Sequence, residues 1–294
     1  MMVRSQAQLE NLSSAISDLV EKIAPSIVSI HTSRSRSSGF VWREGLVVTA
    51  DESLPDDGDA AITPMQGNTV PASVVGRDST TDVALLRVES PSLPPVTLDS
   101  SPVKTGQIAV AIGAEEGVAL AAFGIVSRTT GSWRSLRGGE IDAWIELDLR
   151  LPRNAEGGLA LNAFGRPVGM AVFGARKRVL VIPNSTVERV AAKLASHGYV
   201  ARGYLGLGLQ PVSIEGGEGW GAMVMSVDPK GPARAAGIQQ GDILVAWNDE
   251  PIPNIRFLSR VLGPDSVGKE AIFDLRRGQE TRQVRLTIGE RPAD

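Results

Sequence analysis

Few side chains in this chain could perform catalysis. It has two histidines, His31 and His197, and no cysteine. A serine or threonine hydroxyl becomes a strong nucleophile only when a base takes its proton, and histidine is the usual base at neutral pH. His31 lies in a run that predicts a strand, and His197 lies near the C-terminal end of a predicted helix, where positive charge is favoured. We therefore expect both histidines to be structural.

Length and composition favour a turn-rich β protein with two domains. The chain has 294 residues, of which 42% are hydrophobic, so it can bury a sizeable core. Its 32 glycines and 18 prolines indicate many turns rather than a helix bundle. The net charge of −3 gives no reason to expect nucleic acid or an anionic membrane as a partner. Without cysteine, disulfides and thiolate metal sites are excluded.

Hydrophobic patterning divides the chain into segments. Apolar residues recur at helical spacing over 5–23, and Pro25 ends that predicted helix. From residue 26 to about residue 183, many short strands alternate with turns, which indicates a sandwich or a pair of barrels. A helix follows over 184–197, with Gly198 as its C-terminal stop. Beyond it, strands and two short helical segments predict a smaller domain.

Five motifs occur in order along the chain. They are Ser-Gly-Phe-Val at 38–41, Thr-Asp-Val-Ala-Leu-Leu at 81–86, Asn-Ala-Glu-Gly-Gly at 154–158, Arg-Gly-Tyr-Leu-Gly at 202–206 and Ala-Gly-Ile-Gln-Gln-Gly-Asp-Ile-Leu at 236–244. Together they resemble the motifs of the HtrA/DegP group of trypsin-like serine proteases with a C-terminal PDZ domain. Each motif alone is weak, whereas five in the family's order are specific.

The resemblance implies the fold and its division into domains. The fold would be mainly β, a chymotrypsin/trypsin-like double β-barrel with six strands in each barrel, followed by a PDZ domain. We expect the protease-fold domain, with its N-terminal helix, at 1–198, a linker at 199–203 and the PDZ domain at 204–291.

By the same resemblance, the family's triad positions are Glu52 for the base, Asp82 for the orienting acid and Glu156 for the nucleophile. The serine-protease mechanism needs a hydroxyl, an imidazole and a carboxylate, and only Asp82 keeps the family's residue type. Asn154 also replaces a glycine of the oxyanion loop, and a carboxylate at Glu156 would oppose the negative charge that this loop should stabilise. The resemblance thus implies a degenerate member, a pseudoprotease without catalytic residues.

The resemblance also implies that the three carboxylates converge. Close like charges raise a pKa or attract a cation, and oxygen ligands suit Ca²⁺, Mg²⁺ or Mn²⁺. Three alternatives stay open. The carboxylates are solvated or paired with Arg150 and Arg153, they bind a divalent cation, or they act in a hydrolase, with or without metal. We expect no other cofactor.

PDZ domains bind an extended peptide as an added strand and hold its terminal carboxylate with backbone amides. By resemblance, the carboxylate loop is 204–207, the edge strand is 208–210, and a helix over 254–262 forms the other wall of the groove. The apolar residues of that helix are too many for one face, and the sequence does not assign them. The predicted peptide-binding residues are Tyr204, Leu205, Gly206, Leu207, Gly208 and Leu209.

These features predict an HtrA-like pseudoprotease that serves protein quality control as a peptide- or protein-binding scaffold, regulator or chaperone-like factor. Its partners would be protein or peptide C-termini and not nucleic acid. The alternative is a hydrolase, either a serine endopeptidase by homology or an enzyme that uses the carboxylates. The family's trimers suggest a homo-oligomer, and the apolar stripe over 9–23 fits self-association and packing on its own domain equally well.

The resemblance implies a periplasmic or other extracytoplasmic location. The first residues lead into a polar segment and not into the apolar core of a signal peptide. No run reaches the apolar length that spans a bilayer. We therefore expect either a cytoplasmic protein or the loss of an export or anchor segment from this chain.

Overall fold

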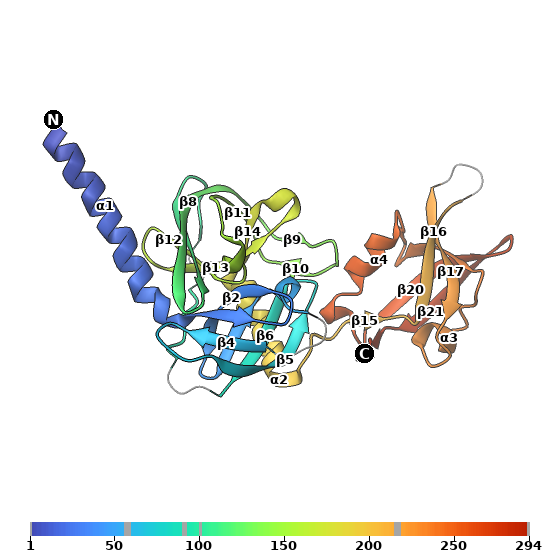
Figure 1. The fold of residues 1–294 in the computed structure, drawn as a ribbon. Helices are drawn as coiled ribbons and strands as arrows, with labels where there is room; N and C mark the ends of the chain where they lie inside the picture. The colour runs from blue at the N-terminus through green and yellow to red at the C-terminus, as the bar shows by residue number, and fades with distance from the viewer. Residues whose placement is uncertain (1, 56–59, 90–92, 100–101, 215–218, 293–294) are drawn as a thin grey trace. The chain divides into compact units, whose positions relative to one another are not determined.

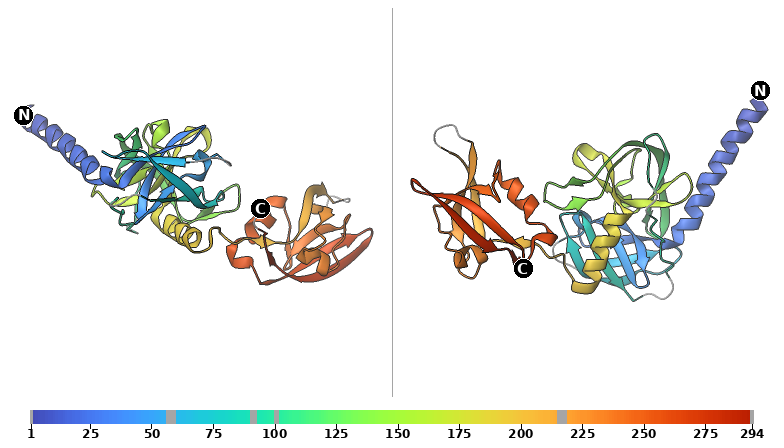
Figure 2. Two further views of the ribbon diagram at one scale, coloured as in Figure 1. Left: turned by 60° about the horizontal axis from the view of Figure 1, so that its bottom comes forward. Right: turned by 180° about the vertical axis from the view of Figure 1, so that it is seen from behind.

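The chain divides into two compact units in a computed structural model that describes residues 2–55, 60–89, 93–99, 102–214 and 219–292. One unit comprises Met1–Ser135 with Glu140–Tyr199, and the other comprises Leu136–Gly139 with Val200–Asp294. Strands dominate both units (Figures 1 and 2). The prediction of a mainly β fold is therefore confirmed.

The first unit contains two closed, antiparallel, six-stranded barrels, as the resemblance implied. The first barrel has the strand order β1-β2-β3-β6-β5-β4 and consists of β1 (Ile27–His31), β2 (Arg36–Arg43), β3 (Leu46–Thr49), β4 (Ala60–Pro64), β5 (Val70–Asp78) and β6 (Val83–Val88). The second has the order β11-β14-β13-β12-β7-β8 and consists of β7 (Ile108–Glu115), β8 (Val118–Thr130), β11 (Trp144–Asp148), β12 (Leu159–Asn162), β13 (Pro167–Phe173) and β14 (Val179–Pro183).

Each barrel has its own apolar core, built by side chains that alternate along the strands. The first core is rich in large aliphatic residues such as Ile30, Ile62 and Leu86. The second uses smaller residues, among them Ala111 and Ala171. Both barrels also support 3₁₀ turns, and the described ones are η1 (Ala24–Ser26), η2 (Asp51–Ser53), η3 (Arg153–Ala155) and η4 (Ala175–Lys177).

Two helices accompany the barrels. The helix α2 (Asn184–His197) matches its prediction, and Gly198 ends it with φ 80° and an N–H that donates to the Leu194 carbonyl. The helix α1 (Met2–Ile23) begins at Met2. Leu9 and Leu12 are 66% and 42% exposed on α1. None of the described helices has the length and apolar character that would carry it across a membrane.

The second unit is a sheet with the order β16-β17-β18-β20-β21, so β16 is an edge strand. The strand β19 pairs with β18, and β15 pairs with β22. The elements are β15 (Gly203–Tyr204), β16 (Leu207–Ser213), β17 (Trp220–Val227), α3 (Pro232–Ala235), β18 (Ile243–Trp247), β19 (Glu250–Pro251), α4 (Ile255–Val261), η5 (Pro264–Ser266), β20 (Glu270–Arg277), β21 (Glu280–Thr287) and β22 (Gly289–Glu290).

Two apolar runs are interrupted in the structure. The run over 141–147 is divided between two strands, β10 (Glu140–Ile141), which pairs with β9 (Trp133–Arg134), and β11. The run that begins at Tyr204 is interrupted before β16, where Gly206 adopts φ 75°. The strand β4 has a weak sequence signal, because two alanines and a proline flank its β-branched pair, Ile62 and Thr63.

Truncating a fully buried side chain of a first-barrel strand should destabilise the protein. Phe40 in β2 is 0% exposed, whereas Phe164 is 79% exposed. We expect Phe40→Ala to lower the free energy of unfolding by about 3–5 kcal/mol, because it leaves a cavity. The matched variant Phe164→Ala should change it by less than about 1 kcal/mol. Urea unfolding of the full chain measures both values, and equal losses would contradict the burial of Phe40.

Candidate functional site

The turn η2 fixes the backbone of Glu52. Its first residue, Asp51, is buried, and the Arg77 Nε–H donates to the Asp51 carboxylate. The Arg77 guanidinium also donates to the carbonyls of Leu54 at 3.0 Å and Pro55 at 2.8 Å. One arginine thus holds both ends of the turn, while the Glu52 side chain is exposed.

Asp82 lies at the end of a second tight turn. The buried Asp78 carboxylate accepts hydrogen bonds from the hydroxyls of Thr80 and Thr81, at 2.7 and 2.8 Å. Asp82 itself has φ 58°, a left-handed conformation that aspartate tolerates better than most residues. Its Oδ1 accepts the Glu52 N–H at 2.8 Å. This bond joins the predicted base position to the predicted acid position.

Glu156 directly follows η3. Its carbonyl accepts the Ser38 N–H at 2.8 Å, and its Oε1 accepts the Phe173 N–H at 3.2 Å. The side chain is half-buried. Gly157 then turns with φ 81°, where a Cβ would lie 2.4 Å from the Ser38 carbonyl oxygen. A glycine is therefore required beside Glu156 whatever the chemistry of this site.

The amides of this loop are used internally. The N–H of Glu156 donates to the Arg153 carbonyl at 3.3 Å, that of Gly157 donates to Ala171 at 2.9 Å, and that of Gly158 donates to Ala155 at 3.1 Å. An oxyanion hole needs amides aimed at the substrate, where negative charge develops. In this conformation, the amide of Glu156, at the predicted nucleophile position, donates within its own turn.

The predicted peptide-binding residues lie around the junction of β15 and β16. The carbonyls of Leu205 and Gly206 accept the N–H groups of Ala233 and Asp228, at 2.9 and 2.8 Å. These bonds anchor the loop to the rest of the unit. The strand β16 follows this loop. It pairs with β17 along one side, and its other side is the free edge of the sheet.

The helix α4 has a defined inner face. Phe257 and Leu258 are buried in the core, whereas Ile255, Val261 and Leu262 are half-buried and pack against it. Asn254 caps the helix, and its side chain accepts the Phe257 N–H at 3.1 Å. The structure thus assigns the inward set that the sequence left open.

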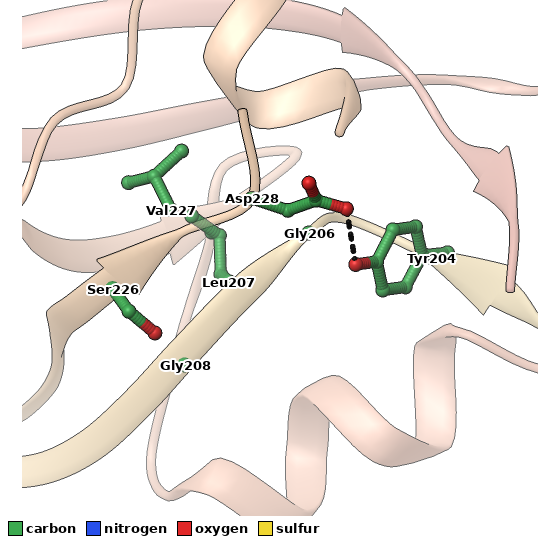
Figure 3. A pocket seen from close by; sticks show the side chains of 7 residues that line it. All are labelled: Tyr204, Gly206, Leu207, Gly208, Ser226, Val227 and Asp228. Carbon is green, nitrogen blue, oxygen red and sulfur yellow. Dashed lines mark hydrogen bonds between the residues drawn. The ribbon is translucent and has the colours of Figure 1, made fainter. Parts of the chain in front are cut away.

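A hollow of about 340 Å³ lies beside the loop (Figure 3). Four of the six predicted peptide-binding residues line it, while Leu205 is buried and Leu209 packs against the core. The remaining lining residues come from the end of β17 and were missed from the sequence. The full lining is Tyr204, Gly206, Leu207, Gly208, Ser226, Val227 and Asp228.

Two family models match the chain, a trypsin-like peptidase domain over residues 37–170 and a PDZ domain over residues 203–288. The "Probable periplasmic serine endoprotease DegP-like" of Brucella suis is 31% identical over 277 residues, which cover 88% of this chain and 53% of the relative. The relative of the same name from Halomonas elongata is 31% identical over 274 residues, covering 88% and 57%. The chain is a DegP/HtrA homologue. It spans about half the length of the curated relatives it matches.

Solved structures share the fold of this DegP/HtrA homologue. The HtrA-type protease AlgW, solved with a decapeptide, superposes with a TM-score of 0.71 at 21% identity, covering 95% of this chain and 99% of that one. The serine endoprotease from Yersinia pestis gives a TM-score of 0.71 at 24% identity, covering 94% and 98%. At this identity the likeness supports the double barrel and the PDZ fold.

In this chain, Glu52, Asp82 and Glu156 lie close enough for charge interactions among them to shift the pKa values of Asp82 and Glu156. Burial raises the pKa of Asp82 to about 7; the N–H bond from Glu52 opposes this shift, and the charges of Glu52 and Glu156 add to it. Burial also raises the pKa of Glu156, against the Phe173 N–H bond; the Glu52 charge adds to the rise and Arg153 counters it. The site is thus an acidic cluster in which the pKa values of Asp82 and Glu156 are raised.

The other catalytic and metal-binding candidates lie apart from this cluster. The His31 ring bonds to Thr63 at 3.0 Å across β1 and β4, and the His197 ring bonds to Ser196 at 2.7 Å. Neither histidine contributes to the pKa shifts of Asp82 or Glu156. Within the described part of the chain, no group of three or more His, Cys, Asp or Glu side chains is arranged to hold a metal ion. The geometry therefore gives the cation alternative no support.

The raised pKa of Asp82 should make the stability of the protein depend on pH. The pKa is about 7 in the folded protein against an ordinary 3.8, so folded Asp82 binds its proton more tightly than unfolded Asp82. Raising the pH from about 4 to about 7 should therefore lower the free energy of unfolding. Asp82→Asn keeps an oxygen that can accept the Glu52 N–H but does not titrate. In this variant the fall in the free energy of unfolding between the two pH values should be smaller by up to about 4 kcal/mol.

The measurement is denaturant unfolding at intervals between about pH 4 and pH 8, a range that brackets the pKa shift. The control is Asp18→Asn, which removes an exposed carboxylate from α1. A wild-type curve with the same pH slope as Asp82→Asn would contradict the assigned burial.

Proposed function

We propose that this chain binds protein or peptide C-termini through the loop before β16 and that its protease-fold unit does not cleave peptides by the serine mechanism. One observation carries the second statement. The residue at the nucleophile position is Glu156, which has no hydroxyl, and its amide donates to the Arg153 carbonyl. The site therefore offers neither an attacking group nor, in this conformation, that amide to an oxyanion.

The contacts of Asp82, at the predicted acid position, also differ from those that a serine protease needs. An aspartate in the triad orients an imidazole and stabilises its positive charge. Asp82 instead accepts the backbone N–H of Glu52, and the charges of three other carboxylates, those of Glu52, Glu156 and Asp51, raise its pKa. A side chain with a pKa of about 7 is largely protonated below neutral pH and supplies little negative charge for that task.

The second unit supports the binding role. Strand addition needs an open sheet edge and a loop that can present amides to a carboxylate. The edge strand β16 and the loop at Leu205 and Gly206, anchored through its carbonyls, fit both needs. The role would be that of a scaffold, a regulator or a chaperone-like factor. An extracytoplasmic location is part of the proposal, since the DegP-like relatives are named periplasmic.

A hydrolase is the second candidate function. The relatives are named serine endoproteases, and the cluster pairs Asp82, with its pKa near 7, with the exposed Glu52. One protonated and one ionised carboxyl group can act as general acid and general base. In that reaction a water molecule, activated by Glu52, would attack the carbonyl carbon, and Asp82 would protonate the leaving group.

Hydrolysis of unfolded casein tests the two candidates. We expect the wild-type chain, the Glu156→Ala variant and the control Glu89→Ala, which removes an exposed carboxylate, all to leave casein intact over hours at neutral pH. Cleavage that is lost in Asp82→Asn or Glu52→Gln but kept in Glu89→Ala would establish the hydrolase and overturn the proposal.

The exposed stripe of α1 predicts self-association. Leu9, Leu12, Ile16, Leu19 and Ile23 alternate at spacings of three and four residues, the pattern of a helix–helix seam. The C-terminal part of this stripe is half-buried, and Leu19 contacts the site of Gly165, whereas Leu9 and Leu12 are exposed. We propose that a second copy of the chain covers the exposed part.

Light scattering after size exclusion measures this association. We expect the wild-type chain to exceed the monomer mass and Leu9→Asp with Leu12→Asp to approach it, because charge in an apolar seam is costly. The matched pair Asn11→Asp with Ser14→Asp adds the same charge on the other side of α1 and should keep the wild-type mass. An identical mass for all three proteins would contradict the role of the stripe.

A further inference from the structure

The hollow beside the PDZ loop lies on the outer face of the sheet. Gly208 in β16 pairs with Ser226 in β17, and Ser226 is exposed. Leu207 and Val227, the preceding pair, pack against the core from the opposite face. Side chains alternate between the two faces of a strand. The Gly208–Ser226 pair therefore faces away from the core, as the Ser226 side chain does in Figure 3.

Gly208 opens this face of the edge strand. A Cβ at this position would lie 2.4 Å from the Ser226 Oγ, so any side chain would occupy the space in front of the serine. With glycine there, a group that approaches from the free edge of β16 can reach across the strand. Ser226 and then Asp228 lie on the far side of that opening.

The polar lining is fixed in place and carries one charged group. The Tyr204 hydroxyl donates to Asp228 Oδ2 at 2.8 Å, and the Lys230 backbone N–H donates to Oδ1 at 2.9 Å. The Lys230 N–H and the Tyr204 hydroxyl lower the pKa of Asp228, and the same bond to Asp228 raises the pKa of Tyr204. Asp228 is the one charged residue among the seven that line the hollow.

An added strand would place one particular side chain here. In a peptide that extends the sheet beside β16, successive side chains point to opposite faces. The last residue, with its carboxylate at the loop, directs its side chain toward the core side and α4. The residue before it then points to the outer face, at the level of Gly208.

We propose that this hollow receives the side chain of the penultimate residue of the bound peptide and selects lysine or arginine there. A long cationic side chain can cross Gly208, pass Ser226 and reach the Asp228 carboxylate. An acidic side chain at the same position would meet that carboxylate as a like charge. The inference rests on the proposed peptide-binding function and adds to it a class of preferred C-termini.

Fluorescence anisotropy of the full chain with labelled octapeptides tests the inference. The peptides end in leucine, valine or phenylalanine, and each is made with lysine, alanine or glutamate at the penultimate position and with a free or an amidated C-terminus. We expect the lysine peptide to bind about three- to tenfold more tightly than the glutamate peptide, the scale of one partly exposed ion pair. Free carboxylates should bind more tightly than amides.

Three variants test whether the charge of Asp228 causes the preference for lysine. Asp228→Asn should bring the lysine-to-glutamate ratio to about one, and Asp228→Lys should reverse it. The control Asp274→Asn removes one charge from β20, outside the hollow, and should keep the wild-type ratio. Circular dichroism of each variant verifies that it is folded.

The outcomes distinguish the inference from the function on which it rests. Carboxylate-dependent binding with equal affinity for the lysine, alanine and glutamate peptides would overturn the hollow's role and leave the groove intact. A lysine preference that persists in Asp228→Asn would also overturn it. Binding to no peptide, or equal binding to amidated peptides, would overturn the proposed function and the inference together.

Discussion

The candidate site depends on the way Ser38 joins the two barrels. From β2, its N–H donates to the Glu156 carbonyl, and its hydroxyl donates to the Asn154 carbonyl at 2.5 Å and accepts the Ala114 N–H at 2.8 Å. The loop also lies so close to β7 that a Cβ at Gly113 would be 2.5 Å from the Ala155 Cα. These contacts use backbone and one hydroxyl, and none of them requires a nucleophile. A protease framework can therefore persist while the residues that perform its chemistry change.

The barrel framework keeps the carboxylates of Glu52, Asp82 and Glu156 close enough to interact, and this proximity has an energetic cost. A triad aspartate is tolerable inside a protein because an imidazolium can pair with it. In this chain Asp82, at the predicted acid position, is half-buried, and its charged neighbours include Glu52 and Glu156. Protonation relieves the repulsion. The hydrogen bond from the Glu52 amide and the left-handed turn at Asp82 hold the geometry despite the charge.

Motif order in the sequence was enough to predict two six-stranded barrels and a PDZ domain. It could not predict the internal bonding of the Glu156 amide, because that depends on how η3 closes. Ser226 and Asp228 were missed for another reason. Their place beside Gly208 follows from the pairing of β16 with β17, which shifts at a bulge between Gly208 and Leu209, and a bulge has no reliable sequence signal. The strand register would have been needed to find them.

The two edges of the PDZ sheet differ in a way that bears on solubility. The strand β21 carries two arginines, Arg282 and Arg285, and charged residues on an edge discourage pairing with foreign strands. The strand β16 has no charged residue. It carries Pro211 instead, which has no N–H to donate and so limits pairing with a foreign strand along part of this edge. Under the proposed peptide binding, a bound C-terminus would cover β16 and protect the rest of this edge from other strands.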